Sequence, residues 1–411
     1  MTPTTTKGNH SVFRVHDPFL RAQLAIAALF CSLGFQYATW AAQIPALKAH
    51  LGLSAAEVGV LLMSTGVGAA ASFPLVTVLM NRLGARRLAL LSALCLALLL
   101  FALAAAPNYP AALAVLGADG VLVGCLNVAM NAQGAALEAR HGRNAMARLH
   151  ATFSGGSLAA AVLASGMNAL SATVTAHFAA AAAVLLLLLG HARPGLLPDE
   201  PPPAAAVRAD RGRRRLPSRM TLWMCGAMAF GTVTEGAMND WSALYLKDVA
   251  RASAELAPMG IAVVSGVMVL ARLFADGWRS RWGDAVIVRA GGALAGAGLA
   301  LALLAGGVLP ALLGFACVGL GIAAVTPCVY VAAAGQGPQA LTLVAAMGTT
   351  GLLAGPPAIG FLANALGLVW GMAAVAASAV VVTLCGLRIR WTPRPAAVPP
   401  AAPGAAAAGE V

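Results

Sequence analysis

Long apolar stretches alternate with short polar segments along most of the chain. Each stretch is about 20 residues or longer, which is the length a helix needs to cross the hydrocarbon core of a bilayer. Charged residues, prolines and glycines separate the stretches. The pattern predicts twelve membrane-spanning helices in two sets of six. The first set covers residues 21–46, 57–80, 87–106, 110–138, 149–170 and 174–191, and the second covers 220–246, 257–275, 285–306, 310–334, 339–363 and 367–387.

Two segments break this apolar pattern. Residues 192–219 are rich in proline and then in arginine, without apolar periodicity, which predicts a solvated cytoplasmic linker. The tail of residues 389–411 is rich in proline and alanine and has little apolar surface to bury, which predicts disorder. The chain therefore divides into a cytoplasmic N-terminal segment (1–20), a first six-helix bundle (21–191), the linker, a second six-helix bundle (220–388) and the tail.

Composition excludes a soluble fold of this length. Of the 411 residues 60% are hydrophobic and only 10% are charged, whereas about 25–35% of a soluble surface is charged. The net charge of +12 does not indicate nucleic-acid binding, because the basic residues lie in short loops between apolar runs. All but three of the 26 Lys and Arg residues fall on one side of the predicted membrane, the exceptions being Lys48, Lys247 and Arg251. This asymmetry predicts a multi-pass protein with both termini in the cytoplasm.

No cofactor, metal or nucleotide site is expected from the motifs. The seven cysteines lie in apolar segments without a C-x-x-C pair, and no H-E-x-x-H occurs. The phosphate-binding pattern G-x-x-x-x-G-K-[ST] is missing from the sequence, so we expect no direct use of ATP. No Ser/His/Asp set presents itself either, and we therefore expect that the protein is not an enzyme.

The two halves share landmarks that indicate an internal repeat. Trp40 and Trp241 each stand near the end of the first span of their half, and Gly59 and Gly260 each follow 19 residues later. Two duplicated six-span halves are typical of secondary transporters, whose substrate site lies at the membrane midplane between the halves. The expected fold is an all-α membrane protein with twelve transmembrane helices in two pseudo-symmetric bundles.

Span seven carries two acidic residues. Ionisable groups inside a membrane are costly and usually face a functional cavity. Glu235 lies past the middle of this span, Asn239 follows one helical turn later, and Asp240 is nearer the outer end. Gly231 and Gly236 weaken the helix around Glu235, as in a broken segment that lines a cavity. We predict substrate-binding or proton-coupling carboxylates, with Glu235 preferred because burial favours its neutral form. The alternative is structural pairing with another helix.

Span four carries a polar stripe. Asn127, Asn131 and Glu138 fall on one helix face, which must meet protein or water. The stripe is either a solute-facing surface or a set of hydrogen bonds that pack membrane helices together. Glu138 lies at the cytoplasmic end, where we predict a gate contact. Asp119, near the start of the span, is either a coupling acid or the partner of a neighbouring helix.

Span one combines amides with aromatic rings. Gln36, Trp40 and Gln43 share a face suited to stacking on and hydrogen-bonding a polar ring, with Tyr37 beside it. The alternative places Trp40 in the interfacial aromatic belt. The predicted substrate or proton-coupling residues are thus Gln36, Tyr37, Trp40, Asp119, Asn127, Asn131, Glu235, Asn239, Asp240 and Trp241.

Several strings resemble a known family. The loop NRLGARR (Asn81–Arg87) resembles the D-R-x-G-R-[RK] signature of the major facilitator superfamily, and a looser second copy runs through Arg272–Asp276 and Arg281–Gly283. The strings AAQIPALKAHLGLS, VAMNAQGAALEARHGRNAMARLH and EGAMNDWSALYL are similar to the MosC-type branch. That branch consists of bacterial inner-membrane proteins and is named for a rhizopine (inositol-amine) transport protein.

The resemblance implies an alternating-access carrier in the bacterial inner membrane, whose loop arginines and acid lock a cytoplasmic gate. The sequence departs from the signature, because Asn81 stands where the first half has Asp, Thr77 where it has Gly, and Ala85 where it has Arg. The residues that the resemblance assigns to the gate are Arg82, Gly84, Arg86, Arg272, Asp276 and Arg281.

Together these observations predict a proton-coupled secondary transporter. Its expected partners are protons, membrane lipid and a small polar solute that is sugar-, polyol- or inositol-amine-like, with neither ATP nor nucleic acid. Two alternatives remain open. One is an efflux antiporter for drugs or metabolites, and the other is a non-transporting membrane receptor or scaffold.

Overall fold

The computed structural model describes residues 17–143, 145–170, 173–199 and 217–391. Within these ranges every regular element is a helix. The helices are α1 (Pro18–Ala41), α2 (Ile44–Leu51), α3 (Ala55–Ala104), α4 (Tyr109–His141), α5 (Met146–Ala169), α6 (Val174–Ala192), α7 (Arg219–Asp248), α8 (Met259–Ala305), α9 (Val308–Ile322), α10 (Val325–Ala334), α11 (Pro338–Leu366) and α12 (Leu368–Arg388).

Twelve spans emerge from these helices, as predicted. Helices α3 and α8 each hold two spans that meet at a glycine kink, Gly84 with φ 76° and Gly283 with φ 79°. Glycine adopts such positive φ values without the clash that a Cβ atom would cause. Helices α9 and α10 form one span that is interrupted at Ala323 and Ala324. The all-α fold with six spans in each half is confirmed.

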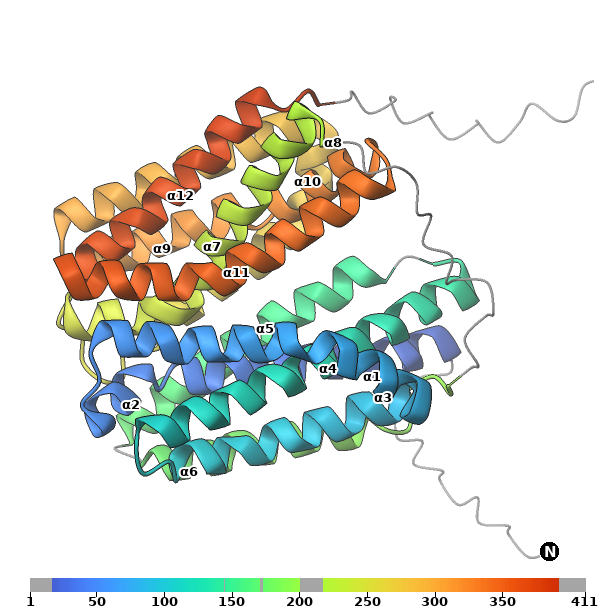
Figure 1. The fold of residues 1–411 in the computed structure, drawn as a ribbon, viewed down its shortest axis with the longest axis horizontal. Helices are drawn as coiled ribbons and strands as arrows, with labels where there is room; N and C mark the ends of the chain where they lie inside the picture. Colours follow the sequence, from blue (N-terminus) through green and yellow to red (C-terminus); the bar gives the residue numbers. More distant parts are fainter. Residues whose placement is uncertain (1–16, 144, 171–172, 200–216, 392–411) are drawn as a thin grey trace, which may run out of the picture.

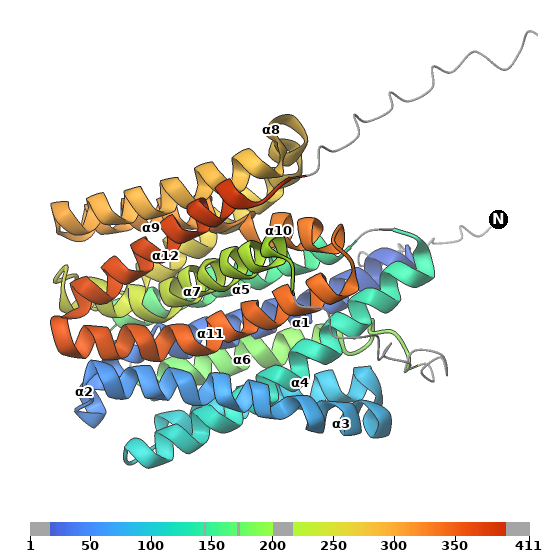
Figure 2. The same ribbon diagram turned by 45° about the horizontal axis from the view of Figure 1, so that its top comes forward.

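The helices form two bundles whose axes run lengthwise through the molecule (Figures 1 and 2). Helices α1–α6 make the first bundle and α7–α12 make the second. The start of α1 and the end of α12 lie at the same end of the molecule, which we call the terminal end (Figure 1). Helix α2 lies at the opposite end, which we call the α2 end.

The two most extensive contacts between the bundles are those of α3 with α11 and of α5 with α8. Gly59 of α3 meets Gly360 of α11 so closely that a Cβ atom on Gly59 would lie 3.0 Å from the Gly360 Cα. Small residues let membrane helices approach at this distance, where dispersion replaces the hydrophobic effect as the packing force. An internal repeat relates span two to span eight and span five to span eleven. It therefore relates the α3–α11 contact to the α5–α8 contact, and the presence of both agrees with such a repeat.

The structure differs from the sequence prediction in two places. The first span ends at Ala41 instead of residue 46, because the chain turns before α2, where Pro45 stands in the first helical turn. The predicted solvated linker begins with buried Leu196 and Leu197, and the Gln133 side chain bonds the Leu197 backbone N–H and C=O. The start of that segment therefore packs on the first bundle. Residues 200–216 and the tail from 392 onward lie outside the described residues.

Polarity is uneven among the spans. Nine helical segments of the described chain are long and apolar enough to cross a membrane. Helix α5, helix α7 and the first arm of α8 (Met259–Ala275) fall short of that criterion. The arm of α8 is apolar but shorter than the required length, whereas α5 and α7 are long enough and lack the apolar composition. All three segments carry the polar network described next.

Candidate functional site

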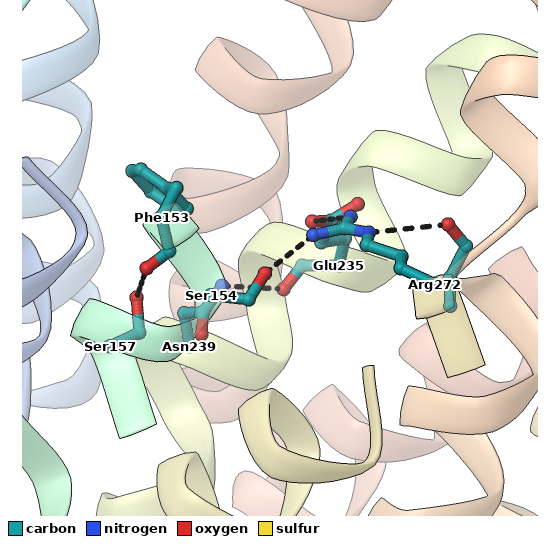
Figure 3. A network of polar contacts seen from close by, with 7 residues as sticks. Phe153, Ser154, Ser157, Glu235, Asn239 and Arg272 are labelled. Atoms are coloured by element: carbon teal, nitrogen blue, oxygen red, sulfur yellow. Dashed lines mark hydrogen bonds and ion pairs between the residues drawn. The ribbon is translucent and has the colours of Figure 1, made fainter. Parts of the chain in front are cut away.

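The centre of the polar network is an ion pair between α7 and α8. The Arg272 guanidinium lies 3.0 Å from the Glu235 carboxylate, and the two side chains are 21% and 26% exposed (Figure 3). Arg272 lies about 16 Å of helix before the Gly283 kink at 1.5 Å per residue, which is near half the thickness of a hydrocarbon core of roughly 30 Å. The pair therefore stands close to the predicted midplane of the membrane.

Arg272 also connects the two bundles. Its Nη1 donates to the Ser154 hydroxyl on α5 at 2.5 Å, and its Nε donates to the Ala323 carbonyl at 3.4 Å (Figure 3). The carbonyl at Ala323 belongs to the interruption between α9 and α10. Irregular backbone at membrane depth needs such a partner, because no bulk water satisfies it. One guanidinium thus holds parts of α5, α7 and the broken span together.

This position corrects the assignment of Arg272. The loop resemblance placed it in the cytoplasmic gate, whereas the structure places it beside Glu235 inside the bundle pair. Asn239 lies one turn from Glu235, as predicted, and its amide donates to the Glu235 carbonyl at 3.2 Å (Figure 3). Ser154 carried no signal in the sequence, because a lone serine is common in membrane helices.

A second contact between the bundles lies toward the α2 end. The Tyr37 hydroxyl on α1 donates to the Asp240 carboxylate on α7, and the Asp240 side chain is buried. The Tyr37 ring packs edge-on against Trp40 with ring centroids 5.2 Å apart. Trp241, next to Asp240, is completely buried, and its indole N–H has no partner. The structure thus brings Tyr37 and Asp240, which were separate candidates in spans one and seven, into contact.

A third carboxylate lies within the first bundle. Asp119 of α4 accepts a hydrogen bond of 2.6 Å from the amide of Gln36 on α1. Both residues are buried. Gln36 immediately precedes Tyr37, so one turn of α1 contacts Asp119 in its own bundle and Asp240 in the other. The structure thereby brings three predicted site residues of span one and span four next to span seven.

The remaining amides of span one and span four take other positions. Gln43 bonds Asn168 at 3.3 Å and His177 at 2.9 Å, all inside the first bundle. Trp40 is buried in the core, which rules out the interfacial belt and leaves it against the Tyr37 ring. Asn131 donates to the Asn127 carbonyl and side chain at 2.8 Å, and Asn127 is exposed.

Glu138 does not make the predicted contact between the bundles. Its carboxylate accepts hydrogen bonds from the backbone N–H of Ala145 at 2.5 Å and of Met146 at 2.9 Å. These groups begin α5, and the first N–H groups of a helix have no partner within the helix. Glu138 therefore caps a neighbouring helix of its own bundle in this conformation.

The first gate loop has a carboxylate that the signature did not reveal. The backbone N–H of Arg86 donates to the Asp199 side chain at 2.8 Å, and its guanidinium donates to the Arg193 carbonyl at 2.9 Å. Asp199 follows α6 and lies directly against Gly84. A carboxylate from a distant segment thus reaches the loop in which Asn81 replaces the signature Asp. Arg82 is exposed.

The second gate loop is built on a different ion pair. Arg279 and Asp284 flank the Gly283 kink and lie 2.8 Å apart. Arg281 is exposed and lies over the Trp282 ring at 5.9 Å. The Asp276 side chain lies outside the described part of the structure. Sequence reasoning did not single out Asp284. The signal in the sequence was an acidic and a basic residue placed on either side of Gly283.

Comparison with known proteins agrees with the fold. The sequence model of the Major Facilitator Superfamily matches residues 24–338. The uncharacterized transporter y4wD of Sinorhizobium fredii is 34% identical over 346 residues, which is 83% of this chain and 90% of that protein. Membrane protein MosC of Rhizobium meliloti is 32% identical over 379 residues, which is 89% of this chain and 90% of that protein.

Solved structures show the same arrangement of helices. A D-xylose-proton symporter superposes with a TM-score of 0.73 at 15% identity, covering 91% of this chain and 98% of that one. At this identity the likeness concerns the fold alone.

Proposed function

The chain belongs to the Major Facilitator Superfamily, and from that premise we propose that this multi-pass transporter uses a proton gradient to drive the transport of a small polar solute. The solute is sugar-, polyol- or inositol-amine-like. The observation that carries the proposal is the network of Glu235, Arg272 and Ser154, which lies between the bundles near the membrane midplane. Midplane sites between repeated halves are where secondary transporters bind their solutes.

The chemistry of this network favours a polar solute. Glu235 accepts hydrogen bonds, Arg272 donates them in a planar fork, and Asn239 and Ser154 do both. Hydroxyl and amino groups of a small ring match such a set, whereas a hydrophobic cation has no donor for the amide and hydroxyl acceptors. A D-xylose-proton symporter shares this fold, so the architecture can accommodate a solute of this size and polarity.

Alternating access explains how the two bundles serve transport. At the α2 end Lys48 contacts Asp248 at 2.5 Å, and Ser165 and Asn168 donate to the backbone carbonyls of Glu255 and Ala254 at 2.5 Å and 2.8 Å. With Tyr37 and Asp240, these contacts hold the α2 end together. Rocking of the bundles would break them and expose the midplane site to the other side.

The positions of the basic residues support the proposed orientation. Arg82, Arg86, Arg281 and Arg388 lie in or beside the segments of the terminal end, and positive residues favour the cytoplasmic side. The correction to Arg272 removes one arginine from that side and leaves the asymmetry in place. We therefore place the terminal end in the cytoplasm and the protein in the bacterial inner membrane.

The test is counterflow in liposomes that contain the purified full chain. The probes are D-xylose, myo-inositol, glucosamine and tetraphenylphosphonium, each measured with and without an inward proton gradient. We expect exchange of one of the polar probes, stimulated by the gradient, and loss of that exchange in Glu235→Gln. The control is Glu57→Gln, because this residue belongs to the capping box of α3, where glutamine also serves.

Each other outcome contradicts a stated part of the proposal. Exchange of tetraphenylphosphonium alone would support the efflux alternative instead. Full exchange by Glu235→Gln would remove this residue from the solute site. If neither these probes nor further polyols, sugars and amino sugars are exchanged, the receptor or scaffold alternative replaces transport.

A further inference from the structure

The contact between Gln36 and Asp119 leaves two oxygen atoms without partners. The Gln36 Nε2 donates to the Asp119 Oδ1 at 2.6 Å. The amide oxygen of Gln36, Oε1, and the second carboxylate oxygen of Asp119, Oδ2, are buried and have no hydrogen-bond partner. The residues themselves are only 1% and 2% exposed. Buried polar atoms are nearly always hydrogen-bonded, so two unpaired atoms in one contact need an explanation.

Both unpaired atoms are acceptors when Asp119 is ionised. An amide oxygen and a carboxylate oxygen cannot bond each other, and each costs about 1–3 kcal/mol when it is buried without a donor. A proton on Asp119 Oδ2 changes this, because a carboxylic acid has one donor. The acid then donates to Gln36 Oε1 while Gln36 Nε2 donates to Oδ1, and a single proton pairs both atoms.

Among the residues that the structure describes, Asp119 makes no ion pair. Its neighbours include the side chains of Gln36 and Tyr37 on α1, with Asp240 of α7 beyond Tyr37, and the backbone carbonyl of Thr65 on α3, which lies against the adjacent Gly120. None of these is a cation. A lone charge inside a membrane protein costs several kcal/mol. The neutral acid removes this cost together with that of the unpaired atoms.

Glu235 is in the opposite situation. Its carboxylate contacts the Arg272 guanidinium at 3.0 Å. Protonation of Glu235 would leave Arg272 without its counter-charge in the middle of the membrane, and an uncompensated buried charge is strongly destabilising. The residue that sequence reasoning preferred as the proton carrier is thus paired with a cation in this structure, whereas Asp119 is paired with an amide.

We infer that Asp119 is the proton-binding site of the transporter, with the proton on Oδ2 shared with Gln36 Oε1. This inference rests on the proposed proton coupling and names the residue that performs it. In the protonated state the acid and the amide form a closed pair within the first bundle. In the deprotonated state the proton has left to solvent and Asp119 carries a negative charge beside the turn of α1 that holds Gln36 and Tyr37.

The neighbouring contact explains how this charge acts on the bundles. Tyr37 lies within the fields of both Asp119 and Asp240, and it makes the hydrogen bond that joins α1 to α7. In contrast to Asp119, Asp240 has no oxygen that is both buried and without a partner, so it can carry its charge, and a negative charge on Asp119 repels it. Loss of the proton therefore weakens the closed α2 end, and its return strengthens it. Proton binding from the α2 side closes that side, and proton release at the terminal end reopens it, which is the order that symport requires.

Infrared spectroscopy tests this site without any solute, so the result does not depend on the solute class. The full chain is measured in lipid at neutral pH for the C=O stretching band of a protonated carboxylic acid. We expect a band in the wild type that is lost in Asp119→Asn and kept in Glu57→Gln and Glu235→Gln. Asparagine has the shape of the acid and pairs with Gln36 by its own N–H, so the variant is expected to fold.

Gln36→Leu provides a second variant that keeps the acid. Without the amide acceptor, the acid band is expected to move to higher frequency. Gln36→Asn keeps an amide, so its band is expected to lie between those of Gln36→Leu and the wild type. Wild-type and Asp119→Asn spectra that coincide in the acid region would show that Asp119 is ionised and would overturn the inference. An acid band that Gln36→Leu leaves unmoved would overturn the pairing. Neither result depends on whether the counterflow experiment succeeds.

Discussion

Asp119 and Glu235 are both carboxylates inside the helical bundles, and their surroundings are opposite. Asp119 is almost completely buried, and its partner is a neutral amide in the same bundle. Glu235 is one-quarter exposed, and its partner is a guanidinium that also reaches α5 of the other bundle. The first environment disfavours charge, whereas the second is built around it.

The difference separates two tasks that one acidic residue was expected to perform. A carboxylate held by a guanidinium offers a fixed acceptor to a solute. A carboxylate with an amide partner binds and releases a proton but is closed to a solute. Transport coupled to protons needs both behaviours, and we propose that they are divided between α4 and α7. Four substitutions, ordered from the largest expected effect to the smallest, test this division.

The largest effect is expected for Arg272→Gln, which gives Glu235 the amide partner that Asp119 has. Glu235 becomes an uncompensated charge, at a cost of about 2–3 kcal/mol, below the 3–5 kcal/mol of a fully buried pair because both side chains are partly exposed. We expect a lower Tm in detergent and a loss of solute exchange of roughly 100-fold. The double variant with Glu235→Gln should regain the Tm and remain unable to exchange solute. If Arg272→Gln alone were as stable as the wild type, the proposed contrast between Asp119 and Glu235 would be wrong.

Tyr37→Phe addresses Asp240, the carboxylate with a hydroxyl partner. A hydrogen bond to a charged group contributes about 1.5–3 kcal/mol, so removal of the hydroxyl should shift the ratio of closed to open α2 ends by roughly 10- to 100-fold. Spin labels on exposed Ala49 and Arg251 report this as a population of longer distances. Tyr109→Phe is the matched control, because its hydroxyl bonds Glu57 within the first bundle. Equal distance distributions in both variants would remove Tyr37 from the closure.

A smaller effect is expected for Lys48→Met at the rim of the α2 end. Lys48 and Asp248 are 28% and 37% exposed, and exposed ion pairs contribute less than about 1 kcal/mol. The same spin labels should show a shift of a few-fold at low salt that fades at high salt, since salt screens exposed charges. A shift larger than that of Tyr37→Phe would mean that closure depends on the rim and not on the buried contact.

The smallest effect is expected for Asp17→Asn, at a carboxylate outside the membrane. The hydrogen bond from Arg143, at 3.1 Å, and then the one from the Phe19 N–H lower the pKa of Asp17. Its stabilising charge is therefore present above the ordinary carboxyl pKa and is lost as the pH falls through the lowered value. Asparagine still caps α1. The small difference in Tm from the wild type at neutral pH should vanish in acid, and a difference that grows in acid would contradict this account.

Sequence reasoning found the spans and the acidic candidates for the same physical reason. Lipid penalises every charge and every unpaired backbone group, so apolar runs mark the helices, and Asp119, Glu235 and Asp240 stand out within them. It misplaced Arg272, because the short string around it resembles a loop while the helix continues to Gly283. It gave no signal for Ser154 or for Asp199, whose importance comes from what they contact.

The spans, their number and their division into two halves are determined by the sequence, because hydropathy is summed along one helix at a time. Which polar groups meet depends on how each helix is rotated and tilted against its neighbours. Gln36 and Asp119 are separated by 83 residues, Tyr37 and Asp240 by 203, and Ser154 and Arg272 by 118. Only packing decides these pairs, and it gives Glu235 a cation and Asp119 an amide as partner.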